Sequence, residues 1–142
     1  MERSLILIKP DGTQRNLTGV ILARFEGAGL KLVGLKMLQM DKRLATKHYA
    51  VHIEKPFFTG LVDYISSGPI VAAVFEGDNA VSIIRGVTGA TDPKKAAPGT
   101  IRAEFGLNIE HNTIHASDSP ETAKDEIALF FSGSELFEFR KA

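Results

Sequence analysis

The chain has 142 residues, 44% of them hydrophobic, and its 17 basic and 17 acidic side chains leave no net charge. This length fits a single domain whose core needs no disulfide or metal, and the absence of cysteine excludes disulfides, thiolate zinc sites and cysteine nucleophiles. Zero net charge argues against non-specific binding to duplex nucleic acid, but it is compatible with a small cationic pocket.

The hydropathy pattern predicts neither a signal peptide nor a membrane-spanning segment. The apolar run at residues 5–8 is interrupted by Lys9 and Pro10, which is not the layout of a signal peptide. The longest apolar run, residues 70–75, is far too short to span a bilayer. No repeat or linker divides the chain. We therefore expect one domain over residues 1–142 in a cytoplasmic protein.

The first half of the chain alternates strand and helix patterns. A short apolar strand over residues 4–9 precedes Pro10-Asp11-Gly12, which is typical of a turn. Helical spacing of apolar residues predicts a helix over 19–28, followed by a strand over 30–40. Asp41 is suited to cap a helix that runs to about residue 52.

The middle of the chain contains a second helix, a buried strand and a long loop. Phe57, Leu61 and Ile65 share one helical face, and Gly68-Pro69 ends that helix. Residues 70–76 read as a buried strand, and a short helix follows to about residue 85. Residues 86–99 contain three glycines and two prolines with no clear period. A long loop of this kind in a small domain is usually functional or disordered.

The last third adds a helical turn over 100–105, a short strand over 113–116 and a final helix that begins at Ser119-Pro120-Glu121 and runs to about 131. The order β-α-β-α-α-β-α-β-α predicts an α+β fold of the ferredoxin-like, split βαβ type, with a four-stranded antiparallel sheet covered by helices. The order of the strands within the sheet does not follow from this pattern.

Several common catalytic motifs are absent. The sequence has no G-x-x-x-x-G-K-S/T phosphate loop, no G-x-G-x-x-G, no G-x-S-x-G, no protein-kinase H-R-D or D-F-G, and no H-E-x-x-H. Any phosphate chemistry must therefore be built from other groups.

Four polar segments supply such groups. They are residues 9–12, Arg85 with Thr91, residues 99–102 and residues 112–118. Together they contain three cations, one histidine and several short polar side chains, which suits the transfer of a phosphoryl group from a polyanionic triphosphate. Each residue taken singly also fits a plain role: a surface or ion-paired cation, a turn threonine, or a hydrogen-bonded structural histidine.

The order of these segments resembles one enzyme family. Residues 112–119, Asn-Thr-Ile-His-Ala-Ser-Asp-Ser, are similar to the active-site signature of nucleoside diphosphate kinases. Further similar segments lie in the family's order and spacing from about residue 3 to residue 137: Lys9-Pro10-Asp11-Gly12 with Gln14-Arg15, His48-Tyr49, Lys55-Pro56-Phe57-Phe58, Ser67-Gly68-Pro69, Arg85, Gly89-x-Thr91 and Ala97-Pro98-Gly99-Thr100-Ile101-Arg102.

This resemblance implies a catalytic mechanism. A γ-phosphoryl group would pass from a nucleoside triphosphate to a nucleoside diphosphate by a ping-pong route, through a phosphohistidine at His115 and with broad base specificity. Glu126 would fix the tautomer and orientation of the His115 ring, with Ser117 as a near neighbour of Glu126. The rival interpretation is a non-catalytic nucleotide-binding or protein-interaction module with the same fold, which would be marked by loss of His115, Lys9 or an arginine of the phosphate site. None of these residues is lost.

The resemblance also implies how the substrate is bound. Lys9, Arg85 and Arg102 would hold the phosphates, with Tyr49 and Thr91 adding hydroxyl donors. Asn112 and Lys9 would contact the ribose, while Phe57, Leu61 and Ile109 would contact the rest of the nucleoside. Phe57 and Leu61 also fit an ordinary core stripe. Mg²⁺ would be held mainly by the phosphates and water, without a protein metal site, and the family's subunits would assemble into a tetramer or hexamer.

The remaining histidines give weaker signals. His48 and His52 have the i, i+4 spacing of metal ligands, but the sequence offers no obvious third ligand, so a structural or surface role is favoured. His111 is expected in a loop. Asp92 and Glu104 depart from residues common in the family, at positions to which no chemistry is assigned.

Overall fold

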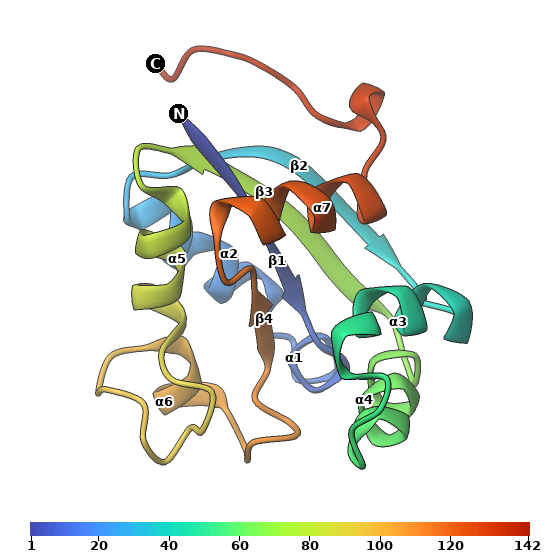
Figure 1. Ribbon diagram of the computed structural model, residues 1–142. Coiled ribbons are helices and arrows are strands. Elements are labelled where there is room, and N and C mark those ends of the chain that lie inside the picture. Colours follow the sequence, from blue (N-terminus) through green and yellow to red (C-terminus); the bar gives the residue numbers. More distant parts are fainter.

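A four-stranded antiparallel sheet organises the molecule. The computed structural model describes residues Met1–Ala142, with strands β1 (Glu2–Ile8), β2 (Lys31–Leu38), β3 (Ile70–Gly77) and β4 (Ile114–Ala116). Their order in the sheet is β2-β3-β1-β4, and every neighbouring pair is antiparallel (Figure 1). The predicted ferredoxin-like α+β class is thus confirmed, and the strand order that the sequence left open is defined.

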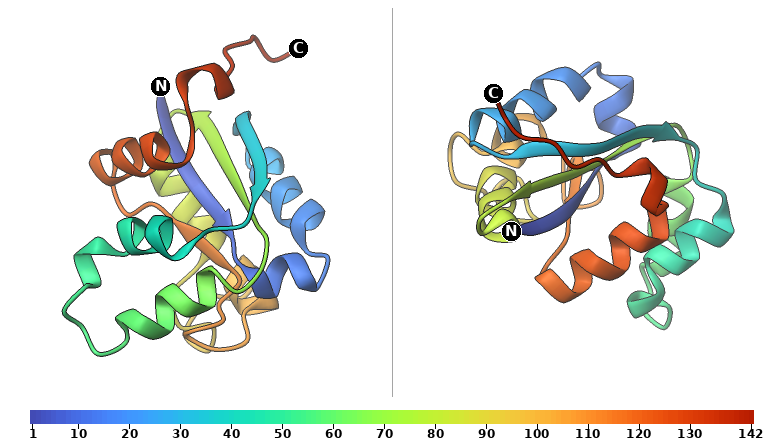
Figure 2. Two further views of the ribbon diagram at one scale, coloured as in Figure 1. Left: turned by 90° about the vertical axis from the view of Figure 1, so that its right-hand side faces the viewer. Right: turned by 90° about the horizontal axis from the view of Figure 1, so that it is seen from above.

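Helices cover both faces of the sheet. One face packs against α2 (Thr18–Gly27), α5 (Ala80–Thr88) and α6 (Ile101–Phe105), and the other packs against α3 (Lys42–His48), α4 (Phe58–Ile65) and α7 (Pro120–Phe130). The views in Figure 2 show α2 and α7 on opposite sides of the sheet. Two separate hydrophobic clusters result, which we call the α3/α7 core and the α2/α5 core.

The pleat of the strands assigns each side chain to one of these cores. In β1, Leu5 and Leu7 belong to the α3/α7 core, while Ile6 and Ile8 belong to the α2/α5 core. In β4, Ile114 and Ala116 pack into the α2/α5 core. Because successive residues of a strand point to opposite faces, His115 faces α3 and α7, and it lies opposite Leu7 in the register of the two strands.

The connections differ from the sequence prediction in several places. Residues Pro10–Gln14 form a short helix, α1, rather than a turn, because proline is favoured at the first helical position, where no amide hydrogen is needed. The helix predicted to run to residue 52 ends at His48 and is followed by a 3-10 turn, η1 (Ala50–His52). Helix α5 continues to Thr88, which shortens the predicted loop.

The C-terminal segment returns along the sheet beyond α7. A 3-10 turn that was not predicted, η2 (Gly133–Glu135), is followed by a backbone bond from the Phe137 amide to the Val33 carbonyl at 2.9 Å. Both termini lie at the same end of the molecule in Figure 1, and the views in Figure 2 show them well apart. None of the helices has both the length and the apolar character needed to cross a bilayer.

Candidate active site

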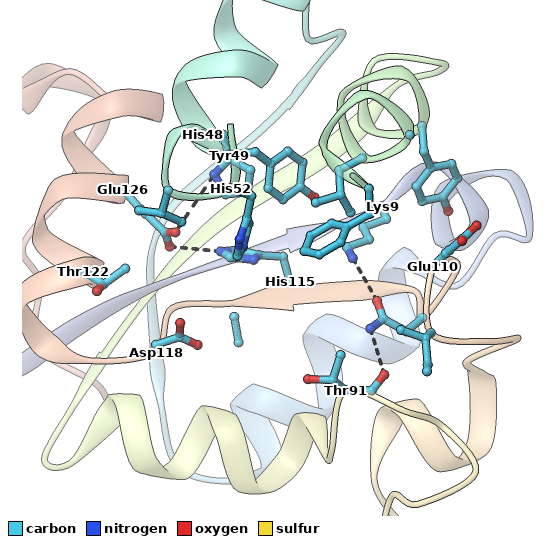
Figure 3. Close-up of a pocket in the computed structure, with 18 of the residues that line it drawn as sticks. Lys9, His48, Tyr49, His52, Thr91, Glu110, His115, Asp118, Thr122 and Glu126 are labelled. Atoms are coloured by element: carbon cyan, nitrogen blue, oxygen red, sulfur yellow. Dashed lines mark hydrogen bonds and ion pairs between the residues drawn. The ribbon is translucent and has the colours of Figure 1, made fainter. Parts of the chain in front are cut away.

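A cavity of about 1120 Å³ opens between α3 and α4 on one side and the segments around Arg85 and residues 109–112 on the other. Lys9, just beyond β1, and His115 of β4 also line it (Figure 3). The structure brings together every residue that the sequence placed at the site except Ser117, which lies behind Glu126. The predicted residues that line the cavity are Lys9, Tyr49, Phe57, Leu61, Arg85, Thr91, Arg102, Ile109, Asn112, His115 and Glu126.

His115 is held by a carboxylate on the first turns of α7. Its Nε2 lies 2.9 Å from Glu126 Oε1, and the Ser117 hydroxyl donates to the same oxygen at 2.6 Å. Burial alone would raise the pKa of Glu126, but the bonds from His115 and Ser117 outweigh it and lower that pKa. The carboxylate is therefore ionised and accepts a hydrogen bond from Nε2–H. In a neutral imidazole this leaves the lone pair on Nδ1.

His48 packs directly against this pair. Its ring is nearly perpendicular to the His115 ring, with the centroids 4.5 Å apart, and its Nδ1 is 4.0 Å from Glu126 Oε2. Burial, with repulsion from His115, lowers the pKa of His48 to about 3, so this ring is neutral. His48 is thus not at the surface, one of the two roles favoured from the sequence, and its partner is not His52, whose ring packs on Phe57 instead.

Lys9 lies at the inner end of the cavity. Its Nζ donates to Asn112 Oδ1 at 2.9 Å, and Asn112 Nδ2 donates to the Thr91 carbonyl at 2.9 Å. These bonds tie the end of β1 to the two loops that flank it. Burial, with repulsion from Arg102, lowers the pKa of Lys9 to about 8.

The two arginines differ in their surroundings. Arg102 is buried and donates to the Gly89 carbonyl at 3.0 Å and the Ile114 carbonyl at 2.7 Å, and burial lowers its pKa to about 10. Arg85 is more exposed and donates to Asp118 Oδ1 at 2.8 Å. One arginine is therefore fixed by the backbone, whereas the other is held by an exposed carboxylate.

The outer part of the cavity is apolar and open. Phe57 and Ile109 both line it, yet they are 50% and 56% exposed. Deeper inside, Tyr49 packs against His48 with the ring centroids 4.6 Å apart, and burial raises its pKa to about 12. The phenol therefore stays protonated at neutral pH, so its hydroxyl can donate a hydrogen bond.

A buried carboxylate supports the inner end of the cavity. Asp11 accepts bonds from the Thr113 hydroxyl, at 2.7 Å, and from the Tyr64 hydroxyl. Thr113 has a positive φ of 80°, which is unusual for a β-branched residue. Its carbonyl accepts the Lys9 amide at 2.9 Å. Asp11 thus holds the strained residue that precedes β4.

The family model described as nucleoside diphosphate kinase matches residues 2–136. The chain belongs to the nucleoside diphosphate kinase family. Among its relatives, the nucleoside diphosphate kinase of Dehalococcoides mccartyi is 63% identical over 139 residues, covering 98% of each chain. That of Archaeoglobus fulgidus is 54% identical over 142 residues, covering all of this chain and 94% of the relative.

Solved structures of the family agree closely with the fold. The nucleoside diphosphate kinase of Halobacterium salinarum, solved in complex with CDP, superposes with a TM-score of 0.96 at 48% identity, covering 99% of this chain and 93% of the other. A family protein from Babesia bovis gives a TM-score of 0.97 at 44% identity, covering all of this chain and 96% of the other. As a nucleoside diphosphate kinase, the chain transfers a γ-phosphoryl group between nucleotides by the family's two-step phosphohistidine route.

Sequence reasoning missed three groups of this nucleoside diphosphate kinase site. Asp118 belongs to the signature, but its bond to Arg85 joins residues 33 positions apart and could not be read from spacing. The same holds for Asp11, whose partners Tyr64 and Thr113 come from α4 and the start of β4. For His48 a signal existed, since it precedes Tyr49 in a segment similar to the family.

Proposed function

We propose that His115 is the residue phosphorylated during turnover, and that Nδ1 is the attacking atom. The observation that carries this proposal is the 2.9 Å bond between Nε2 and Glu126, because it leaves the Nδ1 lone pair free. Nδ1 forms a bond to the γ-phosphorus while the bond from that phosphorus to the β–γ bridging oxygen breaks, and the nucleoside diphosphate leaves with that electron pair. A second diphosphate then attacks the phosphohistidine, which reverses the step.

Lys9, Arg85 and Arg102 are proposed to bind the phosphates. Lys9 and Arg102 are buried, so their charges act in a medium of low dielectric constant and attract phosphate strongly. Arg85 differs because its partner Asp118 is 79% exposed, and an incoming phosphate can replace that carboxylate at little cost. Tyr49 and Thr91 would add hydroxyl donors to the phosphate oxygens.

The nucleoside is proposed to occupy the outer, apolar part of the cavity. Phe57 would stack on the base, with Leu61 and Ile109 nearby, and Asn112 and Lys9 would contact the ribose. Support comes from the exposed faces of Phe57 and Ile109 and from the relative of Halobacterium salinarum, which was solved with CDP.

Mg²⁺ is proposed as the cofactor, carried by the nucleotide phosphates. The cavity fits this arrangement, because its cations Lys9, Arg85 and Arg102 suit phosphate oxygens. Its carboxylates Asp118 and Glu126 are already bonded to Arg85 and to His115 with Ser117. Mg²⁺ usually keeps several waters and binds through substrate phosphates. When bound, it would neutralise phosphate charge and orient the oxygens, while Lys9, Arg85 and Arg102 hold the remaining charge in place.

The same proposal includes the assembly and location of the enzyme. Residues 1–142 would act as one domain, since both cores share the same sheet. Strand β2 is an edge strand with exposed apolar side chains, Leu35 at 50% and Met37 at 65%, which suits self-association into a tetramer or hexamer. A cytoplasmic location fits substrates that are nucleoside triphosphates of the cell interior.

Covalent labelling tests the nucleophile. Incubation with γ-labelled ATP and Mg²⁺ should give an acid-labile, alkali-stable label on the unmodified protein. His115→Ala should lose both the label and turnover while keeping its circular dichroism spectrum, and Glu138→Gln, at an exposed position outside the cavity, is the control that should keep the label. Turnover by His115→Ala would overturn the mechanism, and binding of nucleotide without any label on the unmodified protein would favour the non-catalytic module.

A further inference from the structure

Three metal-binding side chains meet behind the proposed nucleophile. His48, His115 and Glu126 each offer a ligand atom, and these atoms all lie within 4.8 Å of one another. All three residues are among those that line the cavity. They come from α3, β4 and α7, and His115 is the residue of β4 whose side chain faces α3 and α7.

His48 is the unexplained member of this group. Its side chain is only 1% exposed, yet neither ring nitrogen has a hydrogen-bond partner in the protein. Buried polar atoms are rarely left without partners, so such an atom calls for an explanation. Its Nδ1 lies 4.0 Å from Glu126 Oε2, the carboxylate oxygen that His115 and Ser117 do not use.

We propose that His48, His115 and Glu126 form a site for Zn²⁺, and that zinc bound there stops phosphoryl transfer. Zn²⁺ takes imidazole nitrogens and carboxylate oxygens in a tetrahedron whose ligand atoms are about 3.3 Å apart. Side-chain movements of about 1.5 Å or less bring the three groups to that spacing.

Inhibition follows from the tautomer of His115. A neutral imidazole has one in-plane lone pair, which lies on Nδ1 while Nε2 donates its proton to Glu126. To bind zinc, Nε2 must give its own electron pair to the metal. The Nε2 proton leaves to solvent and a proton from solvent binds Nδ1, so the ring stays neutral. Nδ1 then has no pair with which to attack phosphorus. The zinc-bound enzyme is held in the tautomer that cannot react.

The choice of metal also follows from the ligands. Two imidazoles and one carboxylate suit Zn²⁺, whereas Mg²⁺ prefers oxygen ligands and retains its waters. The Lys9 ammonium is close enough to His48 for its charge to act on that ring, and it opposes a bound cation. We therefore expect affinity in the micromolar range, reversible by chelators, with no displacement by excess Mg²⁺.

Calorimetric titration with Zn²⁺ alone, on the protein without nucleotide, tests the site. One ion should bind per chain. His48→Gln should lower the affinity at least about tenfold, since loss of a direct ligand costs no less than loss of an outer-shell group. His111→Gln is the matched histidine control and should bind as the unmodified protein does. If thermal unfolding shows that His48→Gln does not fold, Glu126→Gln replaces it.

Labelling by γ-labelled ATP then tests the consequence, which rests on the proposed role of His115. Protein kept in free Zn²⁺ well above the dissociation constant found by calorimetry should not become labelled in the presence of Mg²⁺, and a chelator should restore labelling. His48→Gln treated in the same way should label to the same extent with and without zinc.

Absence of micromolar zinc binding, or binding that His48→Gln leaves unchanged, would overturn the proposal, as would full labelling of zinc-loaded protein. The nucleophile itself is tested separately by His115→Ala without zinc, so the two ideas can fail independently.

Discussion

Lys9 shows how the burial of a single side chain sets the pH range in which the site binds phosphate. With a pKa lowered to about 8, Nζ is charged below that pH and becomes neutral as the pH rises through it. Because kcat/KM reports the free enzyme, its value should fall above about pH 8 as the charge that attracts phosphate is lost. Bound nucleotide raises the same pKa, so kcat at saturating substrate should persist to higher pH.

The control for this pH profile is Lys9→Arg. A guanidinium stays charged through the whole range, so the alkaline fall near pH 8 should disappear even though the absolute rate drops with the altered bond to Asn112. An alkaline limb at the same pH in Lys9→Arg would mean that another group titrates there. Steady-state kinetics from pH 6 to about 10 are sufficient for both proteins.

At the scale of elements, the residues at the start of α4 determine the selectivity among nucleotide bases. Phe57, the residue that caps its N-terminus, and Leu61 of its first turn line the cavity. Discrimination among bases needs buried polar groups aimed at the base edge, which neither residue supplies. Stacking contributes about 1–3 kcal/mol and tolerates any base. ATP, GTP, CTP and UTP should therefore all be donors, with kcat/KM values within about two orders of magnitude.

A change at Phe57 tests the stacking contribution. Phe57→Ala should lower kcat/KM for all four donors by about tenfold or more, purines most, without abolishing transfer. Phe57→Leu keeps apolar area but has no ring, so its kcat/KM should lie between those of Phe57→Ala and the unmodified protein. Preference for one base by a factor of thousands in the unmodified protein would require a polar group that reads the base edge.

Elements with strong periodicity could be predicted from the sequence, and those set by tertiary contacts could not. The long strands and α7 were foreseen because apolar period and caps act locally, as with Ser119, whose hydroxyl accepts the Thr122 amide at 3.1 Å. Helix α1 was missed because Pro-Asp-Gly fits a turn as well as a helix start. The role of Asp118 depends on Arg85, far away in the chain, and only the folded molecule shows it.

For the whole molecule, the edge of the sheet predicts assembly. Sedimentation at micromolar concentration should show a species larger than a dimer. Leu35→Glu places a charge on the exposed face of β2 and should yield smaller species, whereas Ile53→Glu, at an apolar position of similar exposure (58%) beyond η1, should not. A monomeric unmodified protein would contradict the proposed tetramer or hexamer.

The three-residue strand β4 also limits how this enzyme can diverge. Ile114 and Ala116 pack into one core and His115 faces the other. Because side chains alternate between the two faces of a strand, a shift of one residue along β4 would turn His115 to the opposite face. Lineages are free to lengthen or shorten the preceding loop, because β4 can keep its register on β1. One inserted or deleted residue within β4 itself would send the imidazole into the α2/α5 core and an isoleucine or alanine toward α7. Inherited length changes should therefore gather before residue 112 and be purged from 114 to 116.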